Sequence, residues 1–231
     1  MEHIFERTER LIGTEALNIL KNSKVCVVGV GGVGSHCIEA LARSGVGRLA
    51  IVDSDVVAPS NINRQIIALH STVGKNKVDV MKERIFDINP NAQVEALCRF
   101  ITKEDPLDFL QGCDYVVDAI DNVTAKIHII EYCKQNNINI ISSMGTGNKL
   151  RPDLFYIDDI KKTSICPLAK VVRRELKSRN IENVKVLCSK ETPKVDPLSG
   201  SEKRTPASIS FVPPVAGYML AGEVIRDLCG L

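Results

Sequence analysis

A glycine-rich turn near the N-terminus has the residue types and spacing of a phosphate-binding loop. Gly29, Gly31 and Gly34 match the pattern G-x-G-x-x-G, and Gly32 adds a fourth glycine. Glycine permits a tight turn and lets backbone N–H groups approach a phosphate, while a helix that begins near Val33 would point its positive dipole end at the anion. The alternative interpretation is that the glycines serve only close packing of a helix on a strand.

Charged side chains follow the turn at distances that indicate which kind of nucleotide binds. Asp53 stands 19 residues after Gly34 at the end of an apolar segment, where a carboxylate can accept hydrogen bonds from ribose hydroxyls. Arg64 and Lys77 come next, and two cations there can offset the charge of a triphosphate as pyrophosphate leaves. A dehydrogenase that binds a nicotinamide cofactor has no use for them. Either cation by itself would be interpreted as an ordinary solvated surface charge.

Further polar side chains extend this candidate ATP site. Asn61 and Gln65 belong to a polar segment that follows the acid, and Asp121 and Asn122 stand where another predicted strand gives way to a helix. Ligands collect at this carboxyl edge of an open α/β sheet, and a carboxylate beside a triphosphate suits Mg²⁺. We therefore predict that Asp121 lies near Mg²⁺ and that both residues lie near the nucleotide. The alternative is that Asp121 or Asn122 is an ordinary helix N-cap.

Alternating strand and helix patterns position these residues. Short valine-rich segments predict buried parallel strands, and the amphipathic segments between them predict helices. The predicted strands cover residues 25–28, 48–53 and 114–118. One predicted helix begins near residue 33, a second opens within the segment 72–78 and ends at Asn89–Pro90, and two more cover about 122–135 and 167–178. This pattern predicts an α/β fold with a Rossmann-like, doubly wound and mostly parallel sheet.

The charge distribution divides the chain, residues 1–231, into two parts of one predicted domain. The net charge of +2 neither favours nor excludes nucleic acid, but the predicted nucleotide-binding part, about 1–148, holds 15 Lys and Arg against 18 Asp and Glu. The basic extension, 149–231, holds 15 against 10 and carries the extra helices and strands, and its span 161–204 holds 12 against 5. Such asymmetry is typical of a protein with a polyanionic partner.

Part of that basic charge lies on one predicted helix. Lys170, Arg173, Arg174 and Lys177 have helical spacing and would form one face that can follow an RNA backbone. The alternative is a solvated face of an ordinary helix. The segment 190–204 is rich in Pro, Gly and Ser and predicts a mobile loop that orders when substrate binds.

The cysteines and the two ends of the chain limit the choice of metal and compartment. The eight cysteines stand at least eleven residues apart, so the sequence predicts no zinc site of usual spacing. The absence of a secretory signal predicts a cytoplasmic protein. The apolar run 211–231 is interrupted by Glu223, Arg226 and Asp227 and predicts no transmembrane segment. We expect this run to pack on the core; the alternative is an amphipathic helix on a membrane surface or a partner.

Taken together, these motifs resemble the ThiF/MoeB/HesA group, the bacterial relatives of ubiquitin-activating enzymes. The matching motifs are GVGGVG at 29–34, DSD at 53–55, NINRQ at 61–65, VGKNK at 73–77 and AIDN at 119–122. The resemblance implies that Asp53 binds the ribose, that Arg64 and Lys77 bind the phosphates, and that Asp121 is the acid associated with magnesium. The opening segment resembles one whose arginine reaches the partner subunit's ATP. This implies a homodimer in which Arg10 crosses the interface.

Within this group, the lack of paired cysteines departs from members that activate small sulfur-carrier proteins. The chain instead resembles the branch of tRNA threonylcarbamoyladenosine dehydratases in its ERLIG opening, its N-x-N-R-Q segment and the run GTGNKLRP at 145–152. That resemblance implies that ATP activates the carboxylate of a threonylcarbamoyl group on an adenosine next to the tRNA anticodon. Ring closure with loss of AMP then gives the cyclic form. A protein of a sulfurtransferase system is a further candidate partner.

Two alternatives stay open beside the dehydrogenase. One is adenylation of the C-terminus of a ubiquitin-like sulfur carrier, for which Cys188 is the best candidate thiol because Lys185 and Lys190 stand nearby. A buried, inert cysteine is the competing interpretation. The other is a non-catalytic, nucleotide-sensing adaptor that docks a sulfurtransferase. The intact set of phosphate-binding residues argues against the adaptor.

Overall fold

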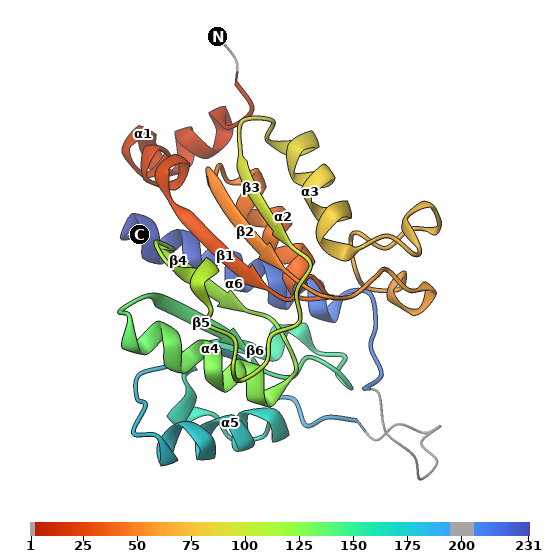
Figure 1. Cartoon of the computed structure of the whole chain (residues 1–231), viewed down its shortest axis with the longest axis vertical. Helices are drawn as coiled ribbons and strands as arrows, with labels where there is room; N and C mark the ends of the chain where they lie inside the picture. The colour runs from red at the N-terminus through yellow and green to blue at the C-terminus, as the bar shows by residue number, and fades with distance from the viewer. Residues whose placement is uncertain (1–2, 195–205) are drawn as a thin grey trace.

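The fold is built on one mostly parallel β-sheet. The computed structural model describes residues 3–194 and 206–231, and within them seven strands form a sheet of order β3-β2-β1-β4-β5-β7-β6 (Figure 1). All neighbouring strands pair parallel except β6 and β7, which pair antiparallel. The strands are β1 Lys24–Val28, β2 Arg48–Val52, β3 Gln93–Leu97, β4 Tyr115–Asp118, β5 Asn139–Ser143, β6 Phe155–Asp159 and β7 Lys185–Ser189.

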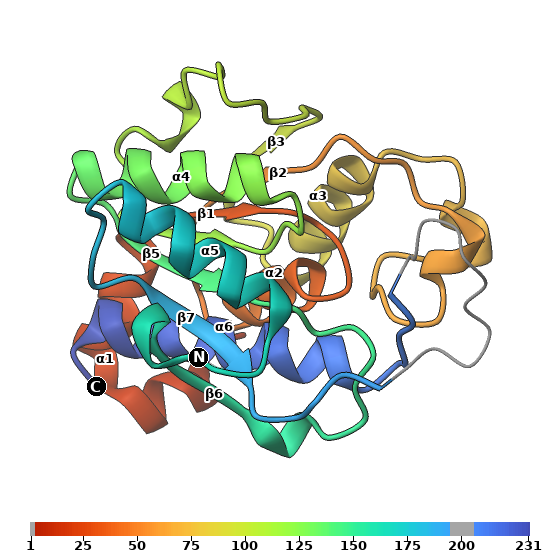
Figure 2. The same ribbon diagram turned by 90° about the horizontal axis from the view of Figure 1, so that it is seen from below.

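Helices cover both faces of this sheet (Figure 2). The helices are α1 Glu6–Asn22, α2 Gly34–Arg43, α3 Lys77–Ile88, α4 Val123–Gln135, α5 Pro167–Ser178 and α6 Val212–Cys229. Side chains alternate along a strand, so Val25 and Val27 enter the core under α2, α3 and α6, while Cys26 and Val28 enter the core under α4 and α5. The prediction of a doubly wound α/β sheet is therefore confirmed.

The basic extension adds to the same sheet. It supplies β6, β7, α5 and α6, and β7 pairs with β5 from the first part of the chain. Helix α6 lies against α2 so closely that a Cβ on Gly217 would stand 2.4 Å from the Val33 carbonyl oxygen. The expectation that the C-terminal run packs on the core is confirmed. No helix of the described ranges has the length and apolar character needed to cross a bilayer. Residues 195–204 of the predicted mobile loop lie outside those ranges.

The glycine turn brings α2 onto the end of β1. Gly29 has a φ of +97°, and a Cβ there would stand 2.8 Å from the Ala119 carbonyl oxygen. A Cβ on Gly34 would stand only 1.7 Å from the Gly29 carbonyl oxygen, so the first residue of α2 touches the backbone of the turn. Gly29 and Gly34 are therefore both needed for this close packing, which does not test their predicted part in binding a nucleotide.

Replacing Gly34 by alanine should destabilise the protein by at least about 3 kcal/mol, because the new methyl group collides with backbone that has no room to move. Chemical denaturation measures this free energy of unfolding. Gly222→Ala in α6 is the matched control, since a Cβ there meets only the flexible end of Arg226 at 3.3 Å. An alanine at position 34 with wild-type stability would contradict the described turn.

Candidate functional site

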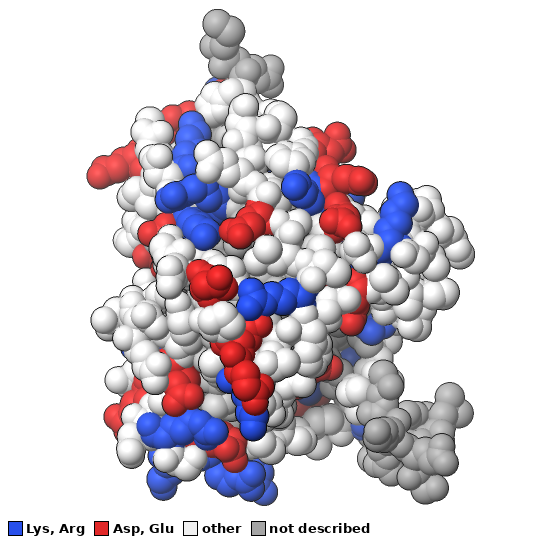
Figure 3. Space-filling view, in the orientation of Figure 1, with Lys and Arg blue, Asp and Glu red and all other residues white. Residues whose placement is uncertain are grey.

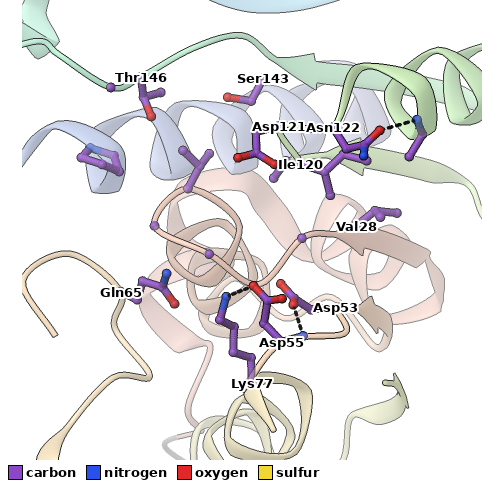
Figure 4. Close-up of a pocket in the computed structure, with 18 of the residues that line it drawn as sticks. Val28, Asp53, Asp55, Gln65, Lys77, Ile120, Asp121, Asn122, Ser143 and Thr146 are labelled. Atoms are coloured by element: carbon purple, nitrogen blue, oxygen red, sulfur yellow. Dashed lines mark hydrogen bonds and ion pairs between the residues drawn. The ribbon is translucent and has the colours of Figure 1, made fainter. Parts of the chain in front are cut away.

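A cavity of about 690 Å³ opens at the carboxyl ends of the strands. Its walls come from the glycine turn, the segments that follow β2, β3, β4 and β5, and residues just before α6. It collects most of the predicted site residues: Gly29, Gly31, Gly32, Asp53, Asn61, Arg64, Gln65, Lys77, Asp121 and Asn122. Gly34 and Arg10 are not among its lining residues. Figure 4 shows Asp53, Asp55 and Lys77 on one side of the cavity, with Asp121 and Ser143 on the other.

Asp53, the predicted ribose ligand, and Lys77, a predicted phosphate ligand, are linked through one intervening residue, Asp55. Asp53 accepts the Val30 N–H at 2.7 Å with one oxygen and the Asp55 N–H at 2.8 Å with the other. Asp55 in turn accepts the Lys77 ammonium at 2.7 Å on its side chain, and its carbonyl oxygen accepts the Lys77 N–H at 3.0 Å. The side chain of Lys77 is only 6% exposed, whereas that of Asp55 is 66% exposed. The ammonium is thus held at the cavity wall with its charge balanced.

The wall between Gly31 and Gln65 leaves space for a ligand. A Cβ on Gly31 would have Gln65 Nε2 at 3.9 Å as its nearest neighbour, so the backbone here faces open space. Gln65 is 6% exposed, and its carbonyl oxygen Oε1 is buried without a hydrogen-bond partner in the described residues. A buried acceptor of this kind calls for a donor from a ligand or from water.

Arg64 and Asn61 reach the same wall in different ways. The stem of Arg64 lies near Gly32, and its guanidinium donates to the Ser60 carbonyl oxygen at 2.8 Å and to Asn63 Oδ1 at 2.9 Å. Asn61 Oδ1 accepts the Ala58 N–H at 3.0 Å, so its side chain shapes the turn in which it lies. Both residues line the cavity, and Arg64 brings a positive charge to its wall.

The turn after β4 separates the roles of its two predicted site residues. Asn122 Oδ1 accepts the Ala125 N–H at 3.0 Å, which makes Asn122 the N-cap of α4. The Asp121 carboxylate is exposed at the cavity and has no hydrogen-bond or ion-pair partner among residues 3–194 and 206–231. Within those ranges, no three His, Cys, Asp or Glu side chains form a metal cluster. A magnesium ion here would need phosphate oxygens and water as its other ligands, as Mg²⁺ usually does.

Several lining residues were not among the predicted site residues. Phe100 is 63% exposed beside the end of β3, Ser143 and Thr146 lie on the far side of the cavity, and Ser208 also lines it. Asp55 belongs to the DSD motif, but its role in holding the Lys77 ammonium became visible only in the structure. The strand-end position of Ser143 is the one signal that could have identified it in advance.

The predicted RNA-binding face lies on α5, next to the cavity. Leu168 in the first turn of α5 lines the cavity, and the exposed Lys170, Arg174 and Lys177 follow it along the helix. Figure 3 shows Lys and Arg side chains gathered at the end of the molecule where α5 lies. Arg173 differs, because its guanidinium donates to the carbonyl and hydroxyl oxygens of Thr163 at 2.6 and 2.7 Å. Its role within the protomer is therefore to anchor the start of α5.

Arg10 lies on α1, away from the cavity of its own chain. Its guanidinium is exposed and pairs with Glu6 on the same helix. Gly13 then changes the direction of α1, since it has a φ of +85° and open space around it. The guanidinium is thus available to a neighbouring molecule.

The thiol proposed for carrier-protein chemistry is placed differently from the expectation. Cys188 lies inside β7 and is 1% exposed. The neighbouring Cys166 and burial raise the pKa of the Cys188 thiol well above its usual value. A thiol that keeps its proton is a poor nucleophile, so the buried, inert interpretation holds.

Comparison with known proteins agrees with this geometry. A tRNA threonylcarbamoyladenosine dehydratase of Bacillus subtilis is 48% identical over 242 aligned positions, which cover 99% of this chain and 95% of that protein. The structure of Escherichia coli tRNA N6-threonylcarbamoyladenosine dehydratase, TcdA, in complex with AMP superposes with a TM-score of 0.90 at 35% identity and covers 98% of this chain and 94% of that one. The same enzyme in complex with ATP gives a TM-score of 0.90 at 34% identity, with 98% and 93% covered.

The family model described as the ThiF family matches residues 5–231, which is nearly the whole chain. The resemblance predicted from the glycine turn and its following motifs is thus confirmed, and the chain belongs to the ThiF family.

Proposed function

We propose that this protein is an ATP-dependent adenylating enzyme that dehydrates threonylcarbamoyladenosine next to the anticodon of tRNA. The observation that carries the proposal is the Asp53–Asp55–Lys77 arrangement beside the glycine turn, in a chain so similar to dehydratases over its full length. We further propose that residues 1–231 form one adenylating domain, because β7 of the basic extension completes the sheet of the nucleotide-binding part. A tRNA substrate and cysteines without disulfides favour the cytoplasm as its compartment.

In the proposed complex, each wall of the cavity holds one part of ATP. The backbone around Gly31 and the amino end of α2 bind phosphate oxygens, and Gln65 Nε2, which lies next to Gly31, donates to them. Asp53 holds the ribose hydroxyls. Arg64 and Lys77 donate to the phosphates, and the exposed Asp55 stays hydrated when the triphosphate takes over its partner. The α-phosphorus is thereby held in one place for attack.

Mg²⁺ fits this site if Asp121 binds it directly or through water. Asp121 offers an exposed carboxylate with no partner in the described ranges, and the phosphates would complete the ion's shell. When bound, Mg²⁺ neutralises charge that builds on the departing pyrophosphate.

The reaction that follows needs no nucleophile from the protein. The threonyl carboxylate of the substrate attacks the α-phosphorus of ATP, and the bond to pyrophosphate breaks. A neighbouring nitrogen of the same substrate then attacks the acyl carbon, loses its proton and expels AMP, which carries away one carboxylate oxygen. The protein's contribution is to bind, orient and neutralise charge.

We propose that the active form is a homodimer in which Arg10 serves the neighbouring protomer. The exposed guanidinium lies outside its own cavity and pairs only with Glu6 in the described residues, so it is free to turn toward a partner. We also propose that Lys170, Arg174 and Lys177 bind tRNA phosphates beside the cavity mouth. Adenylation of a sulfur-carrier protein is the weaker candidate, because Cys188 is buried in β7.

Replacing Lys77 by alanine should lower the rate of dehydration about 100-fold to 1,000-fold, because one donor to the developing charge is lost. Nucleoside mass spectrometry on threonylcarbamoylated tRNA with Mg-ATP measures this rate as loss of one water from the modified adenosine. Lys75→Ala is the control, since Lys75 is exposed in the same segment and should keep wild-type activity and melting temperature. An unchanged nucleoside with wild-type protein would refute the substrate, and an active Lys77→Ala variant would refute the phosphate role.

The Arg10 proposal predicts complementation between two inactive variants. A dimer of Arg10→Ala and Lys77→Ala chains has one complete site, which combines Lys77 of the first chain with Arg10 of the second. Mixed and re-equilibrated variants should recover about a quarter of wild-type activity, because half of the dimers are mixed and each has one of two sites. A mixture that stays inactive, or an Arg10→Ala variant that is active alone, would show that Arg10 does not cross the interface.

Replacing Lys170, Arg174 and Lys177 together by alanine should raise KM for tRNA about ten-fold. It should also reduce the slope of log KM against log salt by about 2 to 3, because tRNA binding then neutralises fewer phosphates and releases fewer counterions. KM for ATP should not change. A Lys21→Ala/Lys103→Ala variant removes exposed charge from other elements and serves as the control. If both variants shift the salt slope equally per charge, α5 is not the tRNA-binding face.

A further inference from the structure

A buried ion pair lies directly beneath the cavity, between α4 and the ends of β4 and β5. Lys126 and Asp118 are both completely buried, with Lys126 Nζ 2.7 Å from Asp118 Oδ2. The ammonium also donates to Ser142 Oγ and to the Ser143 carbonyl oxygen, each at 3.1 Å, so all three of its N–H groups are used. Ser142 Oγ donates to the same Asp118 oxygen at 2.5 Å. The cluster is therefore closed and fully hydrogen-bonded.

This arrangement is expensive, which calls for an explanation. Two charges removed from water cost several kcal/mol each, and apolar residues of similar size often stabilise such a position equally well. Lys126 also stands in the first turn of α4, where the helix dipole disfavours a cation. Stability by itself is thus a poor reason for an ammonium here.

Two segments that line the cavity on the Asp121 side, the turn at 119–122 and the wall at 143–147, are hydrogen-bonded to this cluster. Asp118 Oδ1 accepts the Ile120 N–H at 3.3 Å, which orients the turn that presents Asp121. Lys126 holds the carbonyl of Ser143, the residue from which the cavity wall continues to Thr146. The turn at 119–122 lies where Mg²⁺ is proposed to bind. The segment 143–147 lines the side of the cavity away from Lys77, where we place the acyl group of the substrate.

We propose that Lys126 is a positioning residue that sets the distance between the Asp121 turn and the wall 143–147. Its ammonium fixes the Ser143 carbonyl on one side and, through Asp118, the Ile120 amide on the other. The nucleotide half and the acyl half of the cavity thereby keep the spacing that in-line attack requires. This inference rests on the proposed function for its catalytic consequence, but not for the anchoring itself.

The experiment removes both charges at once, because Lys126→Met alone would leave a buried, unpaired carboxylate and could unfold the protein. The test variant is Asp118→Asn/Lys126→Met. The matched control is Asp227→Asn/Lys185→Met, which removes an ion pair at the amino ends of the strands, where Lys185 Nζ lies 2.7 Å from Asp227 Oδ2. Tyr115 at the start of β4 also donates to Asp227, at 2.6 Å, so the control perturbs the same strand from its far end.

Two measurements are made on each variant: amide hydrogen exchange, and kcat and KM for dehydration of threonylcarbamoylated tRNA. The test variant should exchange faster at 119–122 and 144–147 but not at 29–34. Its kcat should fall about ten-fold to 100-fold, because small displacements of reacting groups carry a cost of this size, while KM for ATP stays within about three-fold. The control should lose melting temperature without a change in kcat.

Unchanged exchange at 119–122 and 144–147 would overturn the anchoring role. Faster exchange there with an unchanged kcat, or a test variant that behaves as the control does, would reduce Lys126 to a stabilising residue. If wild-type protein fails to dehydrate the tRNA, the proposed function is wrong, and the exchange of the two segments alone decides whether Lys126 anchors them.

Discussion

Hydrogen bonds to the two oxygens of Asp53 hold together three segments that are far apart in the sequence. One oxygen takes the Val30 N–H of the glycine turn, and the other takes the N–H of Asp55, whose own side chain holds Lys77 at the start of α3. The turn, the end of β2 and the first turn of α3 therefore keep fixed relative positions before any nucleotide binds. Because the proposed reaction depends on orientation rather than on a protein nucleophile, this rigidity is the main contribution of the fold.

The same chain of contacts explains how a lysine can be kept buried and ready. An ammonium that is 6% exposed would be costly alone, but Asp55 balances its charge while facing water itself. A pair with one hydrated member is weak enough for a triphosphate to displace it. On the far side of the cavity, Asp118 and Lys126 form a fully buried pair, which holds its neighbours firmly instead of yielding to ligand. One pair is suited to exchange with substrate and the other to set geometry.

Much of this could be predicted from the sequence because periodicity and glycine spacing act locally. The helices predicted at about 122–135 and 167–178 are α4 and α5 within one residue, and the cavity collects Asp53, Arg64 and Lys77 as their motifs indicated. The contacts that decide individual roles are not local. Lys126 meets Asp118 only because α4 packs on β4, Arg173 turns inward to Thr163, and Cys188 proved to be a strand residue because β7 inserts between β5 and β6.

The most direct test of the account follows a single oxygen atom. If the substrate carboxylate attacks the α-phosphorus, the AMP expelled on ring closure must contain one oxygen from that carboxylate. tRNA with oxygen-18 in the threonyl carboxylate, incubated with the protein and Mg-ATP, should yield one labelled AMP for each cyclised adenosine, as read by mass spectrometry of both products. Cyclised adenosine accompanied by unlabelled AMP, or by ADP with labelled phosphate, would contradict adenylation as the activating step.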